Sequence, residues 1–126
     1  ACSELLQVVD AAQGLGLAGV ALAGRLRLAR RAPDAAVALA AAEAALATPA
    51  NIEPNGLYRG ERWLGTASAL HAAGLAERSQ ALAREGWAWV LDRATALPEP
   101  WRDAFVHRQP VNLALRALAG TSAVGG

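Results

Sequence analysis

The chain has 126 residues, which is enough for one hydrophobic core and therefore for one domain. Its formal net charge is +1, and its twelve basic residues, all Arg, form no cluster of the kind that a nucleic-acid-binding surface needs. The single cysteine, Cys2, excludes an internal disulfide and a cysteine-based metal cluster.

Seven helices are predicted from the composition and from the residues that cap or break helices. Hydrophobic residues make up 54% of the chain, Ala and Leu dominate, and strand-length runs of β-branched residues are missing, so we expect an all-α fold. Ser3 suits a helix start, Gly74 a left-handed helix end, and Pro110 a first helical turn. The expected helices cover about residues 3–13, 17–32, 34–47, 57–73, 75–97, 101–107 and 110–119. Two prolines and Asn-Gly make residues 49–56 the main loop, and residues 121–126 are expected to be a disordered tail.

The most informative pattern is a helical hairpin over residues 63–79. The small residues Ala67 and Ser79, twelve positions apart, let two antiparallel helices approach closely, and Gly74 closes the turn between them. Trp63 is expected to cover the end of this hairpin with a large apolar ring. Such a hairpin cannot bury its own apolar face, so it is expected to stack on similar hairpins or on a partner.

A second copy of this pattern is predicted nearer the N-terminus. Gly24 and Ala36 are also twelve positions apart, so we expect them to make the same close contact between helices. The two copies are offset by 43 residues, against roughly 34 in tetratricopeptide repeats, and the loop over residues 49–56 accounts for the excess. We therefore expect one domain over residues 1–120, with repeats at about 17–50 and 57–97 and a cap at 98–119.

A glycine motif near the N-terminus has two interpretations. Gly14, Gly16 and Gly19 match G-x-G-x-x-G after an apolar run, which could form the phosphate loop of a nucleotide-binding enzyme with Asp34 as the ribose acid. However, residues 10–13 favour helix, and no second parallel strand is predicted to follow. We prefer a glycine-rich connection between two helices and keep nucleotide binding as an alternative.

Residues that could carry catalysis or bind a metal are isolated from one another. His71 and His107 lack further ligands at metal-binding spacings, and His71 is better explained as a capping or interhelical hydrogen-bonding residue. Cys2 has no histidine close in sequence, and the carboxylates are scattered singly. We therefore predict no catalytic, metal or cofactor site, and no enzyme.

Trp and Arg residues are the best candidates for contacts with a partner. At helical spacing Trp87 falls among core positions, whereas Trp89 falls at their boundary. Trp89 would pack against the C-terminal segment, stack on Arg93 at the rim, or anchor a partner. Arg59 and Arg62 would line a concave groove or lie on a solvated face. The candidate partner-binding residues are therefore Arg59, Arg62, Trp89 and Arg93.

The C-terminal part of the chain resembles a known family. Residues 97–119 contain a proline-rich bend, a short segment in which Trp101 and Phe105 are expected to plug the last hairpin, and a final helix with Asn112. Together with the Trp-containing hairpin over residues 63–97, this segment is similar to the end of bacterial multidomain regulators. Those proteins join a DNA-binding or cyclase domain to a signalling ATPase and tetratricopeptide-like helices. The resemblance implies a sensory or scaffolding segment that binds protein or a small effector and has no chemistry of its own.

Taken together, we expect an all-α, right-handed stack of antiparallel helical hairpins, a tetratricopeptide-like α-α superhelix with a C-terminal cap. Its expected role is a non-catalytic protein–protein interaction or effector-sensing module of a larger bacterial cytoplasmic regulator. The partner would be a protein, a peptide or another domain of the same polypeptide. The alternative is a helical structural or adaptor domain that self-associates through residues 34–47. No membrane segment is expected, since the apolar stretch over residues 15–23 is too short to span a bilayer.

Overall fold

The computed structural model describes residues 2–120, and all regular secondary structure within them is helical. The all-α prediction is therefore confirmed, and the predicted tail over residues 121–126 lies outside the described residues. No helix of the described part is both long enough and apolar enough to cross a bilayer. The seven helices are α1 (Cys2–Gly14), α2 (Ala18–Arg31), α3 (Ala35–Leu46), α4 (Glu61–Ala72), α5 (Ala76–Ala94), α6 (Glu99–His107) and α7 (Pro110–Ala119).

Two helix boundaries differ from the prediction by more than two residues. α4 begins at Glu61 instead of residue 57, because residues 57–60 form turns in which the carbonyl of Tyr58 accepts the N–H of Glu61 at 2.9 Å. α5 ends at Ala94 instead of residue 97. Over residues 95–97 each N–H donates to the carbonyl three residues earlier. These are the hydrogen bonds of a 3₁₀ turn, which is tighter than an α-helix.

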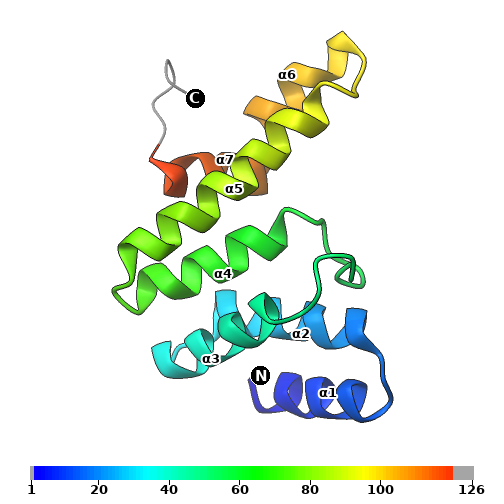
Figure 1. The fold of residues 1–126 in the computed structure, drawn as a ribbon, viewed down its shortest axis with the longest axis vertical. Coiled ribbons are helices and arrows are strands. Elements are labelled where there is room, and N and C mark those ends of the chain that lie inside the picture. The colour runs from blue at the N-terminus through cyan, green and yellow to red at the C-terminus, as the bar shows by residue number, and fades with distance from the viewer. Residues whose placement is uncertain (1, 121–126) are drawn as a thin grey trace.

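The helices pack in an order that follows the chain (Figure 1). α1 lies at one end of the molecule on α2, and α2 packs on α3. α4 contacts both α2 and α3, and α5 packs along α4. At the other end α7 packs on α5 and also contacts α4, while α6 contacts only α5 and α7. α2, α4 and α7 therefore contact one another in series.

The turn after α1 and the turn after α4 have the same local structure. Gly16 (φ +72°) and Gly74 (φ +82°) are both left-handed, as was predicted for Gly74. In each turn the next residue, Leu17 or Leu75, donates its N–H to the carbonyl five residues earlier, at 2.8 and 2.9 Å. This pattern is a Schellman motif, which needs a residue without a Cβ at the left-handed position.

The close approach of α4 and α5 confirms the predicted contact between Ala67 and Ser79. Both residues are buried, and the Ser79 Oγ donates to the Ala67 carbonyl at 2.7 Å. Further along the same pair of helices, a Cβ built on Gly86 would lie 2.7 Å from the Cβ of Trp63. Small residues at these points allow the two helices to approach closely enough for backbone contact.

The predicted contact between Gly24 and Ala36 is wrong. Gly24 lies on the face of α2 that packs on α1, where a Cβ would meet the Val9 Cγ2 at 2.6 Å. Ala36 is exposed in the first turn of α3, and its N–H donates to the capping carboxylate of Asp34 at 2.8 Å. The Schellman turn at Gly16 folds α1 onto α2, so α1 rather than α3 occupies the face that Gly24 leaves open.

The buried apolar side chains form three clusters along the molecule. One joins α1, α2 and α3 to Ala69 of α4, and a second joins α2 and α3 to Ile52 and Leu57 of the loop before α4. The third joins α4, α5 and α7, and it contains Trp87, which is 5% exposed and was predicted as a core residue. The second cluster fixes the loop against α2 and α3, and this loop supplies one wall of the site described next.

Candidate functional site

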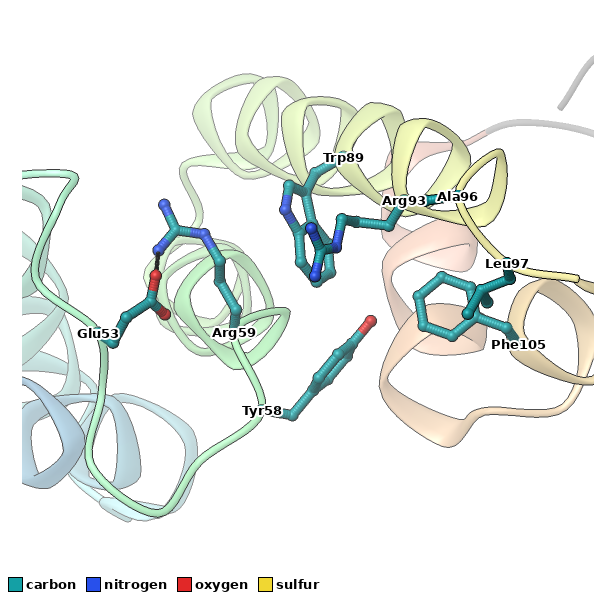
Figure 2. Close-up of a pocket in the computed structure, with 8 residues that line it drawn as sticks. All are labelled: Glu53, Tyr58, Arg59, Trp89, Arg93, Ala96, Leu97 and Phe105. Atoms are coloured by element: carbon teal, nitrogen blue, oxygen red, sulfur yellow. Dashed lines mark hydrogen bonds and ion pairs between the residues drawn. The ribbon is translucent and has the colours of Figure 1, made fainter. Parts of the chain in front are cut away.

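A cavity of about 680 Å³ lies between the loop before α4, the C-terminal half of α5, and α6 (Figure 2). Three of the four candidate residues from the sequence, Arg59, Trp89 and Arg93, line it, so residues predicted from two distant segments come together there. We call this cavity the aromatic groove. Its lining residues are Glu53, Tyr58, Arg59, Trp89, Arg93, Ala96, Leu97 and Phe105.

Aromatic rings form much of the wall of the aromatic groove. The ring of Trp89 lies 5.4 Å from that of Tyr58 and 5.3 Å from that of Trp63, which packs behind it. Phe105 meets Tyr58 edge to face, with ring centroids 6.4 Å apart. Ring pairs at these separations are favourable and restrict side-chain motion. Because Gly86 lets Trp63 approach α5, Trp89 is held between two other aromatic rings.

Tyr58 and α6 are both fixed by Asn112, a fully buried residue of α7. The Tyr58 hydroxyl donates to the Asn112 Oδ1 at 2.9 Å, and the Asn112 Nδ2 donates to the Phe105 carbonyl at 2.8 Å. The N–H of Asn112 donates in turn to the capping side chain of Gln109 at 2.8 Å. Burial raises the pKa of Tyr58, and the positive charge of Arg93 offsets this only in part. Tyr58 is therefore a neutral phenol at physiological pH.

The two arginines of the aromatic groove differ in whether their charges are already paired within the protein. Arg59 forms an ion pair with Glu53 and donates to the Ala50 carbonyl at 3.0 Å. Arg93 is exposed, and its guanidinium carbon lies 6.0 Å from the centre of the Trp89 ring, as the predicted stacking requires. Within the described residues Arg93 has no hydrogen-bond or ion-pair partner. The charge of Arg93 is thus available to a ligand, whereas that of Arg59 is already paired.

Arg62 does not belong to the surface that was predicted for it. Its side chain is buried, and Nη2 donates to the Thr48 carbonyl at 2.5 Å, which joins α4 to the chain just after α3. Burial and the neighbouring Arg59 both lower the pKa of Arg62. Arg62 is therefore a structural residue, and the aromatic groove has no contribution from it.

Of the two residues predicted to plug the last hairpin, Phe105 packs inward and Trp101 does not. Phe105 packs against the third apolar cluster and lines the aromatic groove, but Trp101 is 65% exposed on the outside of α6. Tyr58 is the aromatic lining residue that was not predicted from the sequence. Its signal was weak, because it lies in a loop and its partner Asn112 comes 54 positions later.

The glycine motif near the N-terminus forms a connection between two helices, as preferred from the sequence. Gly14 is the last residue of α1, so a helix stands where a dinucleotide fingerprint needs a strand. Gly19 instead allows close packing with the loop, since a Cβ there would lie 2.7 Å from the Glu53 carbonyl. The Gly19 carbonyl also accepts the N–H of Asn55 at 3.0 Å. The motif thus helps to hold the loop that carries Glu53.

Residues that could bind a metal do not gather in the part of the chain that the structure describes. His71 is exposed and, among these residues, its side chain makes no hydrogen bond, so the predicted interhelical bond is not seen. No group of three or more His, Cys, Asp or Glu side chains is placed to hold a metal ion there. The aromatic groove is therefore the best candidate for a functional site among the described residues.

Comparisons of the chain with protein-family models, with curated proteins and with solved structures found no match.

Proposed function

We propose that the chain is a non-catalytic, tetratricopeptide-like binding module whose ligand, a protein segment or a small effector, occupies the aromatic groove. The observation that carries this proposal is the meeting of Trp89, Tyr58 and Phe105 with the unpaired Arg93 in one cavity of about 680 Å³. Trp, Tyr and Arg are the residues most often responsible for binding energy at interfaces. Rings already fixed by their neighbours lose little conformational entropy on binding.

The order of helix packing supports a stack of helical hairpins. In repeat proteins each hairpin contacts mainly its neighbours, and one helix of each hairpin contacts the equivalent helix of the next. The contact of α2 with α4 follows this scheme, because they are the first helices of the pairs α2/α3 and α4/α5. α7 then covers α4 and α5 as the C-terminal cap. On this interpretation the aromatic groove lies where the last hairpin meets its C-terminal cap.

The wider setting of the module is proposed from the resemblance of residues 97–119. We propose a segment of a larger bacterial cytoplasmic regulator, in which the ligand is a protein, a peptide, another domain of the same polypeptide, or an effector. Self-association through α3 is less well supported. The exposed large apolar side chains of the described residues lie elsewhere, and the exposed Glu43 of α3 is paired with Arg78 of α5 at 2.7 Å.

A capture experiment with matched variants tests this function. The immobilised chain would be exposed to a bacterial lysate, and retained molecules identified by mass spectrometry for wild type, Trp89→Ala and Arg93→Ala. Trp101→Ala and Arg31→Ala are the controls, because each removes an exposed side chain of the same type outside the aromatic groove. We expect specific capture by wild type and by both controls, and loss of that capture in Trp89→Ala and Arg93→Ala. Equal capture by all five proteins would remove the aromatic groove from the proposed function.

A further inference from the structure

The charges around the aromatic groove leave one positive charge unbalanced. Glu53 and Arg59 neutralise each other in an ion pair, and the half-buried, neutral phenol of Tyr58 adds no charge. Arg93 remains, with its guanidinium over the edge of the cavity beside Trp89 (Figure 2). A guanidinium can donate two parallel hydrogen bonds to a carboxylate. The groove is thus complementary to a ligand with one negative charge.

The rest of the wall favours a flat, apolar group beside that charge. Tyr58 and Trp89 are inclined at 57°, and Phe105 stands perpendicular to Tyr58, so the three rings present faces and edges in fixed directions. Aromatic ligands gain from offset stacking and from edge-to-face contacts with such rings. Ala96 and Leu97 add small aliphatic surface at the end of α5.

From this arrangement we propose that the natural occupant of the aromatic groove is a small aromatic monocarboxylate, whose ring packs on Trp89 and Tyr58 while its carboxylate binds Arg93. This inference rests on the proposed function and names its ligand class. A phosphate ester would bring a second negative charge, which Arg93 alone would leave unbalanced, because Arg59 is already paired with Glu53. The volume of about 680 Å³ lies in the range of small-molecule sites, roughly 300–1,000 Å³, so the cavity has room for a compact aromatic acid.

Calorimetric titration with 2-naphthylacetate and its neutral amide, 2-naphthylacetamide, tests the assignment. We expect wild type to bind the acid with a Kd that is roughly millimolar or tighter, and the amide about tenfold more weakly. Arg93→Ala should weaken binding of the acid about tenfold and leave binding of the amide unchanged. This cycle isolates the contact between carboxylate and guanidinium. Arg31→Ala, which removes an exposed arginine far from the aromatic groove in sequence, should change neither affinity.

Three results would overturn the inference. If acid and amide bound equally, or if Arg93→Ala weakened both equally, Arg93 would not be binding the carboxylate of the ligand. Binding of cyclohexylacetate as tight as that of the naphthyl acid would show that the rings do not select aromatic ligands. Tighter binding of acetyl-Ala-Ala-Phe with a free carboxylate than of any small acid would assign the groove to a peptide terminus.

The same titrations separate this inference from the proposed function. If neither naphthyl compound binds, but Trp89→Ala still abolishes capture from the lysate, the ligand class is wrong and the binding module stands. If neither compound binds and Trp89→Ala leaves capture unchanged, the ligand class and the proposed binding function of the aromatic groove are both wrong. The folding control is circular dichroism of each variant. A spectrum that matches that of wild type shows that a loss of binding does not come from unfolding.

Discussion

The hydroxyl of Tyr58 donates a hydrogen bond to the Oδ1 of Asn112 at 2.9 Å, and this bond joins the loop before α4 to the helix that ends the described chain. The same amide donates to the Phe105 carbonyl, so one buried residue fixes two walls of the aromatic groove. Asn112 is fully buried, and its amide would be costly to place there without partners. We infer that Asn112 holds the aromatic groove in shape without lining it.

Replacing Asn112 should therefore destabilise the fold more than its size suggests. Asn112→Ala leaves the Tyr58 hydroxyl and the Phe105 carbonyl without their partner, and we expect a loss of about 2–4 kcal/mol in the free energy of unfolding. Urea denaturation followed by circular dichroism measures it. Tyr58→Phe removes only one of the bonds and should cost about 1 kcal/mol. If Asn112→Ala proved no less stable than Tyr58→Phe, the central role of this amide would be wrong.

Two glycine-to-alanine substitutions should change stability in opposite directions. Gly86→Ala places a Cβ 2.7 Å from that of Trp63, and we expect a loss of about 1–3 kcal/mol despite the better helix propensity of alanine. Gly14→Ala, in the last turn of α1, meets no atom within 4 Å and should stabilise by about 0.5–1 kcal/mol. Thermal unfolding of both variants checks the pair. A more stable Gly86→Ala variant would contradict the close packing of α4 on α5.

The ionisation of Tyr58 can be followed without interference, because the chain contains one tyrosine. Burial raises its pKa above the ordinary value of 10.0, so tyrosinate absorbance in the ultraviolet should rise with a midpoint above that of free tyrosine. The folded state then keeps this proton to a higher pH than the unfolded state. Stability from this group is fully present below about pH 10 and is lost as the pH rises further. A midpoint at or below 10.0 would show that the phenol is not buried against Asn112.

The sequence predicted those parts of the structure that depend on local signals. Gly74 and Pro110 mark helix boundaries through backbone geometry alone, and the contact between Ala67 and Ser79 lies within one hairpin. Gly24 was misassigned because its surroundings depend on whether α1 or α3 covers that face of α2. Tertiary packing decides which helix covers that face, and the spacing of residues in the sequence carries no information about it.

The candidate site shows the same division between local and distant information. Trp89 and Arg93 are one helical turn apart, so their stacking follows from periodicity. Arg62 was wrongly placed on the surface because its burial depends on the path of the loop that brings the Thr48 carbonyl to it. Tyr58 was missed for a similar reason, since only the folded chain brings its hydroxyl to α7.

The central claim, that the aromatic groove is where this protein binds its ligand, is tested most directly by NMR of the tryptophan indole N–H groups. The chain has four tryptophans, and single substitutions assign their signals. During titration with 2-naphthylacetate, we predict that the signal of Trp89 shifts progressively and saturates, while that of Trp101, exposed on α6, stays unchanged. A saturable shift at Trp101 with none at Trp89 would contradict the claim.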